Sequence, residues 1–252
     1  MSNSKKSPFY LAFFGIILAI GFMAAAFILG QQFKNLQQAG VITVKGVAEA
    51  EYKATVASWN VSVSTWGETY AKAVANNQIE LNKAVQFLEQ QGFSADERQI
   101  DSISVNENFV NYEDEKGNTK TRKEGYNAIR TITLTTKQLD KVSAGLKNII
   151  NVCAEDENIN FSNPNYYLEN LDTIKRELIS KATQDAYARA QEFAKTSNVK
   201  VGMLKEASQG SFDIQSTTLS GDNDSSDYGG SYDTSTIDKL VRLVVTIKYR
   251  ID

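Results

Sequence analysis

Phe9–Gly30, FYLAFFGIILAIGFMAAAFILG, is a run of twenty-two residues without a charged side chain. An α-helix rises about 1.5 Å per residue, so this run would span about 33 Å, enough to cross the hydrocarbon core of a bilayer. Charge-free runs of this length are rare in the cores of soluble proteins. The stretch therefore predicts a transmembrane helix over 9–30, and the rest of the chain is interpreted around it.

The residues on either side of this run predict its orientation. Lys5, Lys6 and the free α-amino group precede it without an acidic residue, so the positive-inside rule keeps residues 1–8 in the cytoplasm and exports the rest. A cleaved signal peptide has the same charge pattern and is the alternative. The apolar core exceeds the usual ~7–15 residues of a signal peptide, and Phe27-Ile28-Leu29 follows the small run Ala24-Ala25-Ala26. We therefore interpret 9–30 as an uncleaved signal anchor.

The residues after the anchor divide into a polar stalk, 31–40, and one exported domain, 41–252. Without Lys5 and Lys6, 25 of the 27 basic residues remain against 30 acidic ones, so the exported part is mildly acidic. This surface has no basic footprint for nucleic acid, which we exclude as a partner. The chain has a single cysteine, Cys153, so no intramolecular disulfide forms. We interpret Cys153 as a core residue, with an intermolecular or reactive thiol as the alternative.

The chain contains no histidine. Ser-His-Asp and Cys-His catalysis both need an imidazole base, and the usual zinc sites need imidazole or several thiolates. There is also no Walker-type loop and no Gly-x-Gly-x-x-Gly motif for a nucleotide. We expect no catalytic, cofactor-binding or metal-binding residues, and thus no enzyme. Chemistry that uses carboxylates, lysine or tyrosine is the one enzymatic alternative left open.

The first half of the domain alternates strands and helices. Residues 41–46 predict a strand, and in 57–64 apolar side chains alternate with Ser and Asn, which predicts a strand with one wet face and Trp59 in the core. Thr69 is suited to cap a helix that Gly92 ends. Segments 99–112 and 125–135 predict two strands joined by a charged hairpin tip at 113–118. The apolar face of the helix that Thr69 caps is formed by Val74, Leu81, Val85 and Leu88.

The second half begins with a helix that Thr136 is placed to cap, followed by a short strand at 159–161. The longest exported helix is expected over 171–196. Its apolar stripe becomes small toward the C-terminal half, and small residues let another backbone approach closely. We expect the stripe to pack on the domain's own sheet, and the alternative is helix docking between subunits. The stripe consists of Leu171, Ile174, Leu178, Ala182, Ala186, Ala190 and Ala194.

The last part of the chain predicts a strand at 199–208, a polar insert at 209–235 and a regular final strand at 241–251. The insert is rich in Ser, Gly and Asp without a basic residue, so we expect a flexible acidic loop. Residues 222–227 partly match a calcium loop, but glycine at the sixth position and the closing glutamate are missing. The resulting order is ββα-ββα-βα-ββ. Its middle, 54–161, has the element order of a ferredoxin-like unit, which predicts an α+β fold with a largely antiparallel sheet.

Several of these motifs resemble the SIMPL domain family, over about 41–252. The motifs are Lys45-Gly46-Val47-Ala48, Gly125-Tyr126-Asn127-Ala128, Ile159-Asn160-Phe161, the four-spaced alanines and Val201-Gly202-Met203-Leu204. The sequence departs from the family pattern at Ala48 and Asn198, where glycine is frequent, and at Tyr52-Lys53, where a Pro-Asp pair is frequent. The resemblance implies an exported bacterial envelope protein, ring-like homo-oligomers, a link to envelope or oxidative stress, and no catalytic residues.

Two functional hypotheses follow. The first is a non-enzymatic scaffold, anchored in the bacterial inner membrane with its C-terminal domain in the periplasm or outside, whose copies assemble through strand edges and the alanine-faced helix. The second is a monomeric or dimeric module that binds a ligand or protein, with the acidic insert as the contact segment. The lipid bilayer is the one partner that the residues themselves predict, through 9–30.

Overall fold

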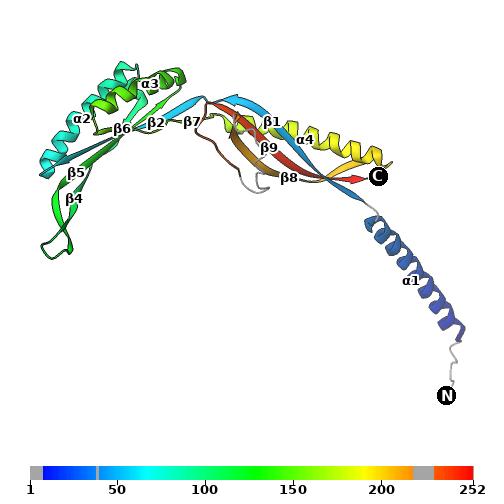
Figure 1. Cartoon of the computed structure of the whole chain (residues 1–252). Helices are drawn as coiled ribbons and strands as arrows, with labels where there is room; N and C mark the ends of the chain where they lie inside the picture. Colours follow the sequence, from blue (N-terminus) through cyan, green and yellow to red (C-terminus); the bar gives the residue numbers. More distant parts are fainter. Residues whose placement is uncertain (1–7, 38–39, 218–229, 252) are drawn as a thin grey trace. The chain divides into compact units, whose positions relative to one another are not determined.

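The computed structural model describes residues 8–37, 40–217 and 230–251 (Figure 1). The chain forms two compact units. The first consists of Met1–Ala48, Ile179–Gly210 and Val244–Asp252, and the second of Glu49–Leu178 and Ser211–Leu243.

The N-terminal apolar run forms helix α1, Pro8–Gln37. Its segment Phe13–Gln31 is long and apolar enough to cross a membrane, and its side chains from 13 to 31 are exposed. An anchor and a signal peptide both meet this description. The helix extends through the first seven residues of the expected stalk because that stretch contains neither proline nor glycine.

A three-stranded sheet has the order β1-β9-β8, with β1 Val41–Lys53, β9 Asp238–Ile251 and β8 Val201–Ser216. It is antiparallel: the Ile251 N–H donates to the Gly40 carbonyl, 2.9 Å away. Gly46 of β1 lies directly against helix α4, Leu171–Thr196, because a Cβ at this position would be 2.0 Å from the Ala182 carbonyl oxygen. The expected alanine face is buried within one chain, which argues against its use between subunits.

The second sheet has six strands around the antiparallel pair β2, Val56–Gly67, and β5, Thr119–Thr136. Strands β3 (Arg98–Ile100) and β4 (Ser104–Glu113) pair with β5, and strands β6 (Ile159–Phe161) and β7 (Asn165–Tyr167) pair with β2. Helices α2, Tyr70–Gln90, and α3, Leu139–Glu155, follow β2 and β5, and a 3₁₀ turn at Ala95–Glu97 precedes β3. The predicted strand–helix–two strands–helix–strand order over 54–161 is thus observed, but the strand predicted at 99–112 is divided into β3 and β4, and β7 was not predicted.

Helices α2 and α3 cover one face of this sheet (Figure 1). The β2 side chains that point to them are buried: Ala57, Trp59, Val61 and Val63. On α2, Leu81 and Leu88 are buried as predicted, whereas Val74 and Val85 are half-buried. Trp59 is a core residue, and its indole N–H donates to the Ser162 carbonyl at 2.8 Å.

The caps and the cysteine test smaller predictions. Thr69 is the N-cap of α2, where its side chain accepts from the Lys72 N–H, and Gly92 follows the helix with φ +85°. The prediction that Thr136 caps α3 is wrong in detail. Thr136 is the last residue of β5, and its hydroxyl accepts from the Gln138 N–H while it donates to Glu97 Oε1. Cys153 is half-buried and not in a disulfide.

The expected insert 209–235 needs correction at both ends. Strand β8 continues to Ser216 rather than ending at Ser208, and Ile214 near its end is buried. Residues 230–235 are fastened to neighbouring segments by hydrogen bonds described below. The partial calcium motif at 222–227 lies outside the described residues. The polar composition of this segment predicted a loop. Ser211 and Asp213 instead lie on strand β8, where their side chains are buried.

Candidate functional site

Within the described residues, no three His, Cys, Asp or Glu side chains are grouped so that they could hold a metal ion. The sequence also designates no catalytic or cofactor-binding residue. A functional site must therefore be sought among charged clusters, cavities and open surfaces. Three features stand out: a carboxyl pair in the second unit, a buried lysine in the same unit, and an open strand edge in the first.

The carboxyl pair consists of Glu80 on α2 and Asp156 just after α3. The ammonium group of Lys83 lies 2.8 Å from Glu80 Oε2 and 2.8 Å from Asp156 Oδ2, and thus joins the two carboxyl groups. The backbone and side-chain amides of Asn158 donate to Asp156 Oδ1 at 3.1 and 3.0 Å. The two carboxyl side chains are 14% and 12% exposed, so water screens them little.

The two carboxyl groups titrate in opposite directions. Burial raises the pKa of Glu80, and the hydrogen bond with Asp156 raises it further because Asp156 accepts its proton. The same hydrogen bond, together with those from Lys83 and Asn158, lowers the pKa of Asp156 well below its usual range. Hydrogen bonds to Asp156 and Glu80 raise the pKa of Lys83. As pH falls, Glu80 therefore takes up a proton before Asp156 does.

The space beside this pair limits what it can do. A cavity of about 140 Å³ is lined by Thr65, Trp66, Asn76, Ile79, Glu80 and Asn158. Pockets for small-molecule ligands have volumes of ~300–1,000 Å³, so this one is too small for a substrate of ordinary size. We interpret the cluster as a clamp between α2 and the turn after α3. Sequence reasoning missed it because Glu80 and Lys83 look like an ordinary helical i,i+3 pair until the fold brings Asp156 to them.

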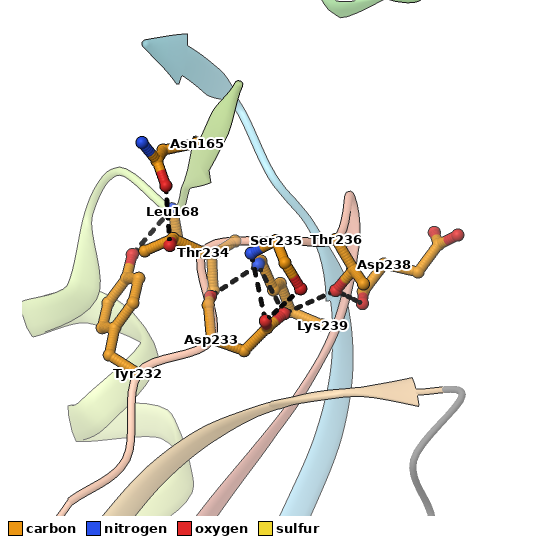
Figure 2. Close-up of polar contacts among 9 residues, drawn as sticks. All are labelled: Asn165, Leu168, Tyr232, Asp233, Thr234, Ser235, Thr236, Asp238 and Lys239. Carbon is orange, nitrogen blue, oxygen red and sulfur yellow. Dashed lines mark hydrogen bonds and ion pairs between the residues drawn. The ribbon is translucent and has the colours of Figure 1, made fainter. Parts of the chain in front are cut away.

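The buried lysine is Lys239, whose side chain has no exposed surface. Its ammonium group donates to the Asp233 carbonyl and lies 2.9 Å from Asp233 Oδ2 (Figure 2). Ser235 and Thr236 donate to the same carboxylate. Burial alone would raise the pKa of Asp233, but these hydrogen bonds outweigh it and hold the pKa well below its usual range.

Residues next to this ion pair fasten it to β7 and the segment after it. The Tyr166 N–H donates to the Thr234 carbonyl at 2.7 Å, and the Thr234 hydroxyl donates to Asn165 Oδ1 at 2.9 Å. The Leu168 N–H donates to the Tyr232 hydroxyl at 3.1 Å (Figure 2). The C-terminal end of the segment predicted to be a flexible loop, residues 230–235, is thus held by both backbone and side-chain hydrogen bonds.

The open edge belongs to β8. Within the described residues, this strand pairs with β9 on one side, and its other side carries a single bridge, from Ile214 to Tyr232. All residues of 203–210 are exposed, so both faces of the strand are open to solvent here. The exposed fraction is 65% for Met203 and 53% for Leu204. At the start of the strand, an open groove of about 450 Å³ is lined by Tyr187, Gln191, Glu192, Ala194, Lys195, Val199, Lys200 and Val201.

These features define the class of protein: an α+β domain with two antiparallel sheets, preceded by an apolar N-terminal helix. Residues 42–238 match the SIMPL family, described as a protein of unknown function (DUF541), and the chain belongs to this family. The resemblance inferred from the motifs is thereby confirmed.

Two curated relatives are each named 26 kDa periplasmic immunogenic protein. One is from Brucella melitensis biotype 1 and the other from Brucella abortus (strain S19). Each is 24% identical to this chain over 210 residues, which cover 82% of the chain and 81% of the relative. A periplasmic relative and an apolar N-terminal helix agree in indicating export.

Proposed function

We propose that this chain is a non-enzymatic protein of the bacterial envelope, anchored in the inner membrane, whose exported domain assembles with copies of itself into a ring-like scaffold. Two things support the anchor: the length of the apolar helix and the lysines before it. The link to envelope or oxidative stress is part of the proposal and comes from what the family resemblance implies.

The open edge of β8 is the observation that carries the proposal of self-assembly. An unpaired strand edge offers a row of N–H and C=O groups to another chain. The other edge of the sheet, β1, is partly closed, because the Val47 N–H donates to Asp185 Oδ2 at 2.9 Å and Arg189 holds that carboxylate. On β8, by contrast, Met203 and Leu204 expose apolar surface beside an open edge. We therefore assign the contact between copies to 203–210.

Light scattering after size exclusion tests the proposal on the full chain in detergent micelles. We expect a large, discrete particle whose mass does not change with protein concentration. The double variant M203K/L204K should reduce it to smaller species, because two charges at the edge oppose strand pairing. The matched control is Ile150→Lys, which places a charge at an exposed apolar position of α3 and should leave the particle intact.

Two outcomes would contradict the proposal. A wild-type protein that is a monomer or dimer at every concentration would favour the second hypothesis, a ligand- or protein-binding module. A particle that survives M203K/L204K would remove β8 from the contact. The intact mass of the same preparation reports on the anchor: an uncleaved chain has a mass of 27.9 kDa, and a cleaved one is smaller.

A further inference from the structure

The face of the six-stranded sheet that points away from α2 and α3 has an unusual composition. Successive side chains of a strand point to opposite faces, so the residues between the buried positions of β2 lie on this outer face. The register of β2 with β5 places Ser62 opposite Thr131 and Asn60 opposite Thr133. The outer face of the two central strands consists of Ser58, Asn60, Ser62, Ser64, Ile129, Thr131, Thr133 and Thr135.

This face has no charged side chain on its central strands, and uncharged polar residues of the short neighbouring strands border it. By register, Asn160 of β6, Asn165 of β7 and Gln99 of β3 lie beside it. The exposed Asp101, two residues after Gln99, donates its N–H to the Thr131 carbonyl at 2.9 Å and places a carboxylate at this edge of the face. Charged residues make up 23% of the chain, and a solvated surface normally carries them at or above that share. Because the central strands carry no charge and the Asp101 carboxylate at the edge is negative, the face has no attraction for nucleic acid, anionic lipid or an acidic peptide, and this favours an uncharged partner.

The polar groups of this face are also free of protein partners. In the described part of the chain, the side chains of seven of these eight residues, all except the apolar Ile129, could hydrogen-bond, yet none does so. Thr136, one residue beyond Thr135 but on the opposite face, has its hydroxyl in two hydrogen bonds. Each free hydroxyl both donates and accepts, so together they match a ligand that is itself rich in hydroxyl groups.

An aromatic ring lies at each end of this strip. Trp66, opposite Asn127, is 45% exposed, and Tyr167, opposite Val56, is 37% exposed. The Trp66 ring is held in place, because its N–H donates to the Glu124 carbonyl at 2.9 Å. A strand rises about 3.3 Å per residue, so the ten residues from Val56 to Trp66 span about 33 Å. The strip is therefore long enough for several rings of a polymer.

We propose that this face binds an uncharged polysaccharide, laid along β2 and β5 with its hydroxyls on the Ser, Thr and Asn side chains. The C–H faces of its terminal rings stack on Trp66 and Tyr167. This binding site is separate from the β8 edge to which we assign self-assembly, so either proposal can fail without the other.

Isothermal titration of the full chain with two neutral probes, hexamers of N-acetylglucosamine and of glucose, tests this site. The protein is kept in a zwitterionic detergent, since detergents with sugar headgroups would compete. We expect binding of at least one hexamer, and a loss of about tenfold or more in affinity for Thr131→Lys, which puts a charge among the hydroxyls. The matched control is Thr119→Lys, an identical change at an exposed position of the same strand near the hairpin turn.

A second variant, S62A/T133A, removes two hydroxyls without adding charge and should also weaken binding, while near-ultraviolet circular dichroism verifies the fold. Three outcomes would overturn the proposal. The wild type binds neither hexamer nor insoluble chitin or cellulose. Affinity is the same in Thr131→Lys and S62A/T133A as in the wild type. The wild type does not bind glycan and Thr131→Lys changes the mass of the assembled particle, which would make this face a contact between copies.

Discussion

At the scale of single residues, Lys239 shows how this fold accommodates a buried charge. Its side chain has no exposed surface, and Asp233 is its ionic partner. Removing a charge from water costs several kcal/mol, which is offset only when the partner and further hydrogen bonds are well placed. Here the Ser235 and Thr236 hydroxyls complete the shell around the carboxylate.

Replacing one member of this pair should destabilise the protein strongly. We expect Asp233→Asn to lower the free energy of unfolding by about 3–5 kcal/mol, because the Lys239 ammonium group stays buried without an anion. Urea unfolding of the full chain in micelles measures the change. The double variant D233N/K239M should recover part of the loss, since neutral residues can replace a buried pair at little cost. Additive losses in the double variant would show that the two charges do not depend on each other.

The Glu80–Asp156 pair predicts a pH dependence of stability. The pKa of Glu80 is raised in the folded chain, so its contribution is fully present below pH ~4.3, the unfolded value, and is lost as pH rises through the folded pKa. Glu80→Gln keeps a hydrogen-bond donor to Asp156 without titrating. At neutral pH we therefore expect the free energy of unfolding of this variant to exceed that of the wild type by on the order of 1 kcal/mol. This difference should disappear toward pH 4.

Asp156→Asn is the matched variant with the opposite sign. The pKa of Asp156 is lowered in the folded chain, so its contribution is present above pH ~3.9 and is lost as pH falls. Asp156→Asn should therefore lower the free energy of unfolding most at neutral pH and little in acid. Urea unfolding between pH 2 and 8, followed by tryptophan fluorescence, compares the two. Wild-type and Glu80→Gln curves that stay parallel across this range would disprove the proton-sharing interpretation.

At the scale of elements, the contact of β1 with α4 depends on small residues. A Cβ at position 46 would lie 2.0 Å from the Ala182 carbonyl oxygen and 2.7 Å from the Ala186 Cβ. Gly46→Val should therefore force strand and helix apart and lower the free energy of unfolding by about 1–3 kcal/mol or more. Gly210→Val is the control, because its Cβ would meet its nearest neighbour, the Val244 carbonyl oxygen, at 3.3 Å. Similar melting temperatures of the two variants, measured by circular dichroism, would contradict the close packing.

The elements that the sequence predicted well are those that a local pattern determines. The alternation along β2 gave its buried residues, and Thr69 gave the start of α2. The three-residue strand β7 escaped prediction, and β3 was merged with β4 into one strand at 99–112, because a two-residue period cannot be recognised over three residues. The end of β8 escaped because Asp213 looked like a loop residue, although Ser231 donates to it in the folded chain.

At the scale of the whole molecule, the α+β class, the antiparallel sheets and the family could be predicted, since they follow from element order and recurring motifs. The division into two sheets could not, because β1 and β9 look like partners of the same sheet as β2 in sequence. The candidate sites were equally out of reach. The carboxyl clamp and the uncharged face each join residues from segments distant in the chain, and neither produces a local pattern.

The lone half-buried thiol of Cys153 has a consequence for how the exported domain matures. With one cysteine in the chain, no stage of folding waits for an oxidase or a disulfide isomerase. A shift of the surroundings toward reducing conditions breaks no covalent link within the chain.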